Sequence, residues 1–227
     1  FGQGWYYDYE GGYFGNFYLQ MARNNRTYKG TARAVSYADA VQIDISKGLS
    51  QWNAVKDVYY DFEGESPARD FAGHAADVRY TAEAAVNDLT QARVASDGEN
   101  IYFLIEAAED IRFNEKTGSY SQLYFSVPGR SGGYYGYQYC VKLAEGRAEI
   151  YSVADGKYEL TLAGNGSFTI GGRYLQVSIP KSALQLSGDF ELWFKVADGA
   201  DLSDPESLYT EGDVLPAGRM NYAFYGK

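Results

Sequence analysis

Alternation of apolar and polar residues with a period of two begins near Val41 and recurs along the rest of the chain, and it restricts the fold more than any other feature. Successive side chains of a β-strand point to opposite faces of a sheet, so this pattern predicts strands that bury one face. Turn-forming pairs such as Asp155-Gly156 and Gly171-Gly172 separate the runs. The predicted strands cover residues 41–46, 101–105, 123–127, 139–143, 148–153, 157–163, 167–170, 173–179, 190–196 and 220–225, with another that begins at Thr90.

Helical periodicity is confined to the N-terminal part of the chain. Aromatic and apolar residues of the segment 14–21 recur at intervals of three and four, which predicts a short amphipathic helix that ends toward Gly30. One further helical turn is expected at 180–186. About ten strands without long intervening helices predict an all-β, antiparallel β-sandwich of jelly-roll or immunoglobulin-like layout with a short N-terminal helix. We expect an aromatic arm and helix at 1–34, which joins an upstream domain, and a sandwich module at 35–227.

The charge and cysteine content of the chain exclude several classes of partner and site. The 227 residues carry a formal net charge of -10, which repels phosphate backbones and anionic lipids, so nucleic acid is not expected as a partner. No apolar run approaches the roughly 20 residues of a transmembrane helix, so membrane insertion is not expected either. Cys140 is the only cysteine, so an internal disulfide and a CxxC metal site are excluded. Its place in a predicted strand indicates a buried thiol without a function. Because the chain begins at Phe1 without an initiator methionine, we expect any signal peptide to lie upstream.

Common catalytic signatures are missing from the sequence. His74 is the only histidine, and its loop-like surroundings at 71–74 predict a solvated turn residue rather than part of a triad. The chain has no GxSxG, HExxH or GxxxxGKS/T motif, so no nucleotide is expected as a ligand. Glycosidases need only a pair of carboxylates, and the 30 acidic residues leave that chemistry open as an alternative.

Acidic residues are dense between residues 57 and 88. Carboxylate oxygens on loops are the ligands that calcium prefers, with roughly six to eight oxygens around the ion. We therefore expect a calcium site with Asp61, Asp70 and Asp88 as ligands. The alternative is that these acids are solvated loop residues, partly paired with Arg69 and Arg79.

The strand around Trp193 predicts an exposed aromatic surface. Its apolar residues share one parity, which places Trp193 on the opposite face between the charged residues Glu191 and Lys195. An outward indole suits the apolar face of a sugar ring, while polar neighbours bind its hydroxyls. The alternative is that a loop or the N-terminal helix covers Trp193. Trp52 follows the first predicted strand and is expected to fill the core rather than to bind a ligand.

A second aromatic group lies in the glycine-flanked segment 132–137, which carries Tyr134, Tyr135 and Tyr137. Such a loop can line a binding cleft, and it can equally cap the end of a sandwich. We expect the three tyrosines to assist Trp193 in binding a ligand.

Several stretches of the chain follow a domain pattern that is already known. They include the segment 43–60, the hairpin sequence Arg93-Val94-Ala95-Ser96-Asp97 with Asn100-Ile101-Tyr102-Phe103, and the segment 177–198. In these stretches the chain resembles the family 9-like carbohydrate-binding, DOMON-like β-sandwich modules. The segment 211–222 is similar to the end of such modules in secreted bacterial glycoside hydrolases.

The resemblance implies a C-terminal accessory module that binds polysaccharide or oligosaccharide beside an upstream catalytic domain of the same chain, with a tendency to bind calcium. Some DOMON-like proteins bind haem, but one histidine and two methionines are a poor supply of axial ligands, so no haem is expected. The expected location is extracellular, cell-surface or periplasmic.

The sequence thus predicts a noncatalytic carbohydrate-binding module of a secreted glycoside hydrolase. One alternative is a structural sandwich that docks a neighbouring domain and binds no glycan. The other is an intrinsic glycosidase.

Overall fold

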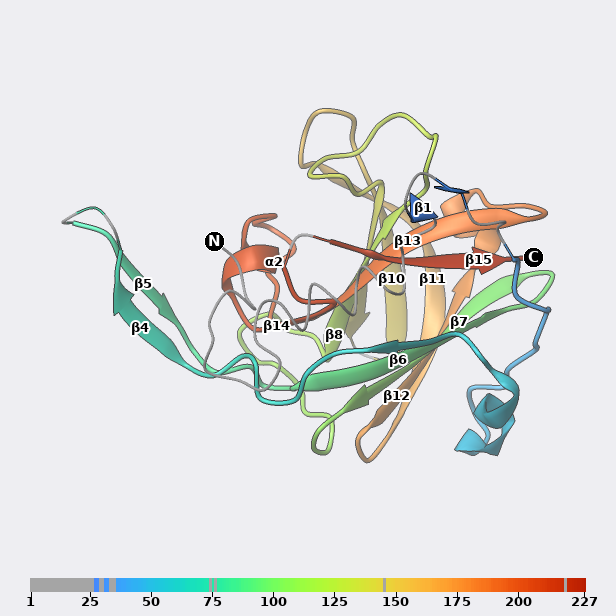
Figure 1. Cartoon of the computed structure of the whole chain (residues 1–227), viewed down its shortest axis with the longest axis horizontal. Coiled ribbons are helices and arrows are strands. Elements are labelled where there is room, and N and C mark those ends of the chain that lie inside the picture. Colours follow the sequence, from blue (N-terminus) through green and yellow to red (C-terminus); the bar gives the residue numbers. More distant parts are fainter. Residues whose placement is uncertain are drawn as a thin grey trace.

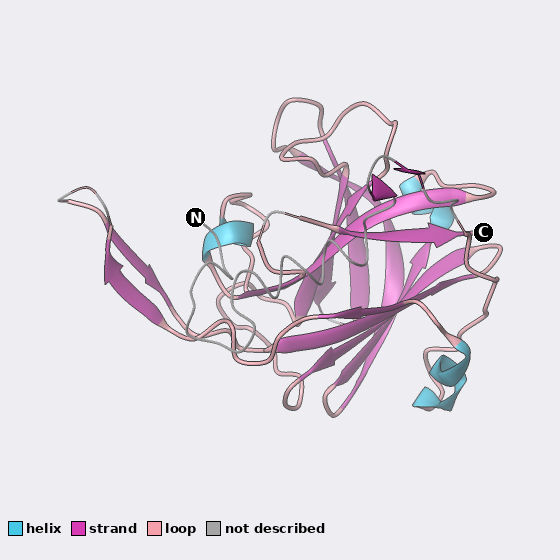
Figure 2. Ribbon diagram, viewed as in Figure 1, coloured by secondary structure: helices cyan, strands magenta, loops and turns pink. Residues whose placement is uncertain are grey.

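The computed structural model describes residues 36–73, 75, 77–144, 146–218 and 220–227, together with the strand residues 27–28 and 31–32. The predicted helix at 14–21 and His74 lie outside the described residues. Within them the fold is all-β and antiparallel (Figure 2). The helices of this part are four to six residues long, and none of them is long and apolar enough to cross a membrane. They are η1 (Leu49–Ala54), η2 (Lys181–Leu184) and α2 (Ser207–Thr210).

One sheet of 11 strands dominates the structure (Figure 1). Two small hairpins form separate two-stranded sheets, and one of these, β4–β5, projects away from the large sheet. The hairpins are β1 (Thr27–Tyr28) with β2 (Thr31–Ala32), and β4 (Arg69–Ala72) with β5 (Arg79–Ala82). The strands of the large sheet are β3 (Val58–Tyr60), β6 (Leu89–Ser96), β7 (Asn100–Ala107), β8 (Ser121–Ser126), β9 (Tyr139–Ala144), β10 (Arg147–Val153), β11 (Leu160–Gly171), β12 (Tyr174–Pro180), β13 (Phe190–Asp198), β14 (Asp213–Leu215) and β15 (Tyr222–Gly226).

The large sheet curls until its two ends nearly meet. Its order is β14-β13-β8-β9-β10-β11-β12-β7-β6-β3, and β15 pairs with the same strand, β13, as β14 does. Side chains join the two ends: the Tyr59 hydroxyl donates to the Ala223 carbonyl at 2.9 Å, and the Tyr222 hydroxyl donates to the Tyr60 carbonyl at 2.5 Å. We call this junction, between β3 and β6 on one side and β13, β14 and β15 on the other, the seam.

This closure corrects the predicted sandwich. A sandwich has two sheets that pack face to face without a shared ladder. Here β12 pairs with β7 and β8 pairs with β13, so hydrogen bonds run continuously from one half of the structure to the other. The result is a single, nearly closed, barrel-like sheet, with all of its strands antiparallel as predicted.

Aromatic and aliphatic side chains fill the inside of the curled sheet. Phe103 lies between Phe125 and Phe194, with ring centroids 5.6 and 5.3 Å away. All three rings are completely buried, and burial of each contributes roughly 2 kcal/mol to stability. The predicted inward parity is therefore confirmed for the strands β7, β8 and β13.

The predicted strand at 41–46 is wrong. Ile43 is buried, but it packs on the outer face of the sheet with Trp52 and Leu104, and the segment joins no ladder of the described sheet. Trp52 is 1% exposed, and its Nε1–H donates to Gln176 Oε1 at 2.7 Å, which confirms its expected place in a core. Alternation here reflects one-sided burial, which does not require a neighbouring strand.

Two predicted strands, at 157–163 and 167–170, form one strand, β11. The glycines at 164 and 166 lie inside the ladder with β10, next to a register shift between Ile150 and Tyr151. A Cβ at Gly166 would collide with the Ser178 carbonyl oxygen. Close approach of a neighbouring strand, and not a turn, therefore explains that glycine.

Candidate functional site

Trp193 lies on the outer face of β13 with its ring accessible. Its neighbours Leu192 and Phe194 are completely buried, whereas Trp193 keeps 42% of its surface exposed, as predicted. The indole Nε1–H donates to Glu191 Oε1 at 2.8 Å. This bond fixes the orientation in which the ring faces solvent.

Glu191 also binds a second aromatic residue. Tyr225 of β15 is its cross-strand partner, and the Tyr225 hydroxyl donates to the same oxygen, Oε1. The Tyr37 ring stands edge-on to Tyr225, with centroids 6.1 Å apart. We call Trp193, Glu191, Tyr225 and Tyr37 the Trp193 platform. It offers an exposed indole with a carboxylate at its edge.

The predicted tyrosine loop is a tight turn with only one well exposed ring. Tyr134 and Tyr137 exchange backbone hydrogen bonds of 3.0 Å, and Gly133 precedes them where a Cβ would collide with the Tyr137 carbonyl. Tyr135 is 44% exposed, and its hydroxyl donates to Glu206 at 2.9 Å, a bond that raises the pKa of the tyrosine.

The other two loop tyrosines support Tyr135 rather than face solvent. The half-buried Tyr134 ring lies 4.9 Å from Tyr135 and 6.1 Å from Tyr158. Tyr137 is 3% exposed and donates to Asn221 Oδ1 at 2.7 Å. Burial raises the pKa of Tyr137, and its ring is out of reach of a ligand.

Trp193 and the tyrosine loop share the outer face of the sheet but form separate groups. Trp193 is opposite Ser126 of β8, and the next outward position of β8 is Tyr124, whose ring packs against Tyr137 at 5.3 Å. Among the described residues, no ring pair or hydrogen bond joins Trp193 to any of the three predicted tyrosines. A ligand on Trp193 therefore meets Glu191 before it meets the loop.

The structure brings together two of the three predicted calcium ligands. Asp61 and Asp88 both lie close enough to Glu65 for their negative charges to interact with its carboxyl, and Glu65 is 1% exposed. Asp88 also accepts a hydrogen bond from the Gly64 amide at 2.8 Å. Asp70 is on the projecting hairpin instead, where it pairs with Arg79, as the alternative interpretation predicts. No group of three acidic, histidine or cysteine side chains within the described residues is arranged to hold a metal ion. Calcium binding stays a prediction.

Lys195 and Asp213 are charged residues buried at the seam, and sequence analysis did not identify either of them as part of a site. Lys195 was expected beside Trp193 on the exposed face, which is wrong: it is completely buried, and its ammonium donates to the carbonyls of Pro216 and, at 2.9 Å, Gly218. Burial lowers its pKa to about 7. Asp213 is buried nearby, accepts Ser66 at 2.7 Å, and has its pKa raised by burial to about 7. The only sequence feature that could have identified these two residues is a charged side chain within a mostly apolar strand, β13 for Lys195 and β14 for Asp213.

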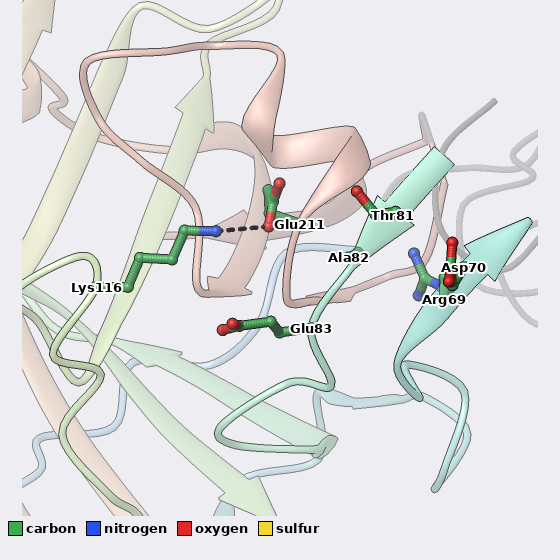
Figure 3. Close-up of a pocket in the computed structure, with 7 residues that line it drawn as sticks. All are labelled: Arg69, Asp70, Thr81, Ala82, Glu83, Lys116 and Glu211. Carbon is green, nitrogen blue, oxygen red and sulfur yellow. Dashed lines mark hydrogen bonds and ion pairs between the residues drawn. The ribbon is translucent and has the colours of Figure 1, made fainter. Parts of the chain in front are cut away.

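A polar depression of about 440 Å³ lies at the base of the β4–β5 hairpin (Figure 3). The ion pair of Lys116 and Glu211, 2.9 Å long, closes one side of it. None of the described residues that line it is aromatic, so they give a sugar ring no stacking surface. Its remaining lining residues are Arg69, Asp70, Thr81, Ala82 and Glu83.

No protein-family model matches the chain, and no curated protein is significantly similar to it. The class that the structure defines is an all-antiparallel β protein with one nearly closed, barrel-like sheet and minimal helices.

Proposed function

We propose that this protein is a noncatalytic carbohydrate-binding module of the family 9-like, DOMON-like type, attached to an upstream catalytic domain of a secreted glycoside hydrolase and located outside the cytoplasm. The observation that supports it is the Trp193 platform, in which an exposed indole is held in one orientation beside a carboxylate. Aromatic planes with polar groups at their edge suit sugars, whose rings have apolar C–H faces and peripheral hydroxyls.

The proposed binding mode is stacking of one sugar ring on Trp193. A single stacked ring with a few hydrogen bonds corresponds to millimolar to micromolar affinity, or about -4 to -8 kcal/mol. Weak binding of this kind is useful in a tethered module, because the linker raises the effective concentration of the catalytic domain at its substrate.

A glycan-array screen followed by NMR titration of the hits tests this function. Wild-type protein is compared with Trp193→Ala and with Tyr80→Ala, which removes a 45% exposed ring from the projecting hairpin. We expect Trp193→Ala to weaken binding at least tenfold, about 1.4 kcal/mol, and Tyr80→Ala to leave it unchanged. Equal binding by the wild type and Trp193→Ala would refute the platform, and cleavage of any glycan would refute a noncatalytic role.

A second candidate function is docking of a neighbouring domain without glycan binding. The β4–β5 hairpin supports it, because it projects from the sheet with Val78 39% and Tyr80 45% exposed (Figure 1). Exposed apolar side chains on a projecting element are typical of contact surfaces. In that case Trp193 fluorescence is insensitive to every sugar, and no array position binds the wild type.

A further inference from the structure

Glu191 uses only one of its two carboxylate oxygens to hold the Trp193 platform together. The indole N–H of Trp193 and the hydroxyl of Tyr225 both donate to Oε1. A carboxylate oxygen has two lone pairs, so these two donors saturate Oε1. Glu191 is thereby fixed from two sides, by its own strand and by β15.

The second oxygen, Oε2, remains available to a ligand. No described residue donates to it, and it is not among the buried polar atoms that lack a partner, so it reaches the surface. Because Oε1 is 2.8 Å from the indole nitrogen, the carboxylate lies at the edge of the exposed ring. A sugar stacked on that ring carries its hydroxyls at the periphery, where Oε2 can accept one of them.

The negative charge of Glu191 is not compensated by Lys195, the next charged residue on the same side of β13. Lys195 has the same parity as Glu191 and Trp193, but its ammonium is buried and donates to the Pro216 and Gly218 carbonyls. An ionised carboxylate only accepts hydrogen bonds, and it repels a second anion. The whole chain, with a net charge of -10, adds to that repulsion.

We propose that Glu191 makes the Trp193 platform selective for uncharged sugars: Oε2 accepts a hydroxyl of a neutral glycan and excludes glycans that carry a carboxylate or sulfate. This selectivity rests on the proposed carbohydrate-binding function. The class of ligand follows from the chemistry of Glu191. A single carboxylate can give selectivity because it binds a neutral ligand and also repels a charged competitor.

Glu191→Gln is the variant that tests the charge with little change of shape. The amide oxygen can still accept from Trp193 and Tyr225, whereas the position of Oε2 becomes an NH₂ donor. Glu109→Gln removes the same charge from an exposed position away from the platform and is the matched control. The indole N–H signal of Trp193 in an NMR spectrum reports whether the platform is intact in each variant.

Binding is measured with pairs of oligosaccharides that differ only in a hexose or the corresponding uronic acid, at low salt. We expect the wild type and Glu109→Gln to bind the neutral member at least tenfold more tightly. We expect Glu191→Gln to weaken neutral binding several-fold and to reduce the discrimination to less than threefold.

Two results overturn the inference while the proposed function stands: equal wild-type affinity for both members of a pair, or unchanged discrimination in Glu191→Gln with an intact Trp193 signal. If the wild type binds neither member of any pair, the proposed function fails, and the inference fails with it.

Discussion

Cys140 illustrates how burial limits chemical reactivity at the scale of a single residue. It lies in β9, is 0% exposed, and packs with Tyr124 and Tyr137 under the segment that contains α2. Burial raises the pKa of its thiol to about 12. Because the thiolate is the reactive form, we expect no reaction of the folded protein with a thiol reagent at pH 8.

The measurement is a colorimetric thiol assay with and without denaturant. One equivalent of thiol should react per chain after unfolding, and none within the same time in the folded state. Rapid labelling of the folded protein would contradict the buried position of Cys140.

Glu191 and Lys195 show what the sequence can predict about a single side chain and what it cannot. Both have the outward parity of β13, and the alternation predicted this correctly, together with the exposure of Trp193 between them. Their exposure differs because the loop after β14 covers Lys195 and supplies its hydrogen-bond acceptors, the carbonyls of Pro216 and Gly218. That loop is distant in sequence, so no local pattern could identify which outward residue it buries.

At the scale of an element, a substitution at Gly166 tests how closely β11 approaches β12. A Cβ there would collide with the backbone oxygen of Ser178 in the neighbouring strand, which cannot move without disturbing the ladder. We expect Gly166→Ala to lower the free energy of unfolding by about 1 to 3 kcal/mol. Gly171→Ala is the control in the same strand, because nothing lies within 4 Å of its added Cβ.

Urea unfolding followed by circular dichroism measures both glycine variants. The Gly171→Ala change should stay within about 0.5 kcal/mol. Equal stability of the two variants would mean that β11 does not pass so close to β12.

Elements whose inner face lies in the core were predicted well, whereas the turn at 164–166 and the strand at 41–46 were not. The strands β7, β8, β9 and β13 have a clear period of two because one face of each is fixed by the core. The predicted turn at 164–166 was wrong because glycine has two causes, a turn and a close approach, that look the same in a sequence. Likewise, Ile43 alternates with polar neighbours although it packs outside the sheet.

At the scale of the whole molecule, the sheet closes through side chains at the seam. A list of antiparallel strands fits a sandwich or a closed sheet equally well, since the difference lies in which distant strands pair, here β12 with β7 and β8 with β13. Polar groups complete the closure: Asp213 of β14 accepts the Leu89 amide of β6 at 2.6 Å. The same region holds Glu65, whose carboxyl is buried and interacts with that of Asp61.

The ionisation of this region makes stability depend on pH. Burial raises the pKa of Glu65 well above its usual range and raises that of Asp213 to about 7. The folded state therefore keeps protons that the unfolded chain releases above about pH 4, so the free energy of unfolding falls as the pH rises from about 4 to about 7. Lys195 has the opposite effect on the pH dependence of stability. Burial lowers its pKa to about 7, so its contribution to the free energy of unfolding increases only above that pH.

Thermal unfolding between pH 5 and pH 7, with a chelator present so that the proton effect is measured without calcium, tests this dependence. We expect the wild-type Tm to fall by on the order of 5 °C over this range. Glu65→Gln keeps the shape of the side chain but stays neutral at every pH, so its Tm should fall less and exceed the wild-type value at pH 7. Glu109→Gln removes an exposed charge and should retain the wild-type slope. If the Tm of Glu65→Gln falls with pH as steeply as the Tm of that control, Glu65 does not hold a proton in the folded state.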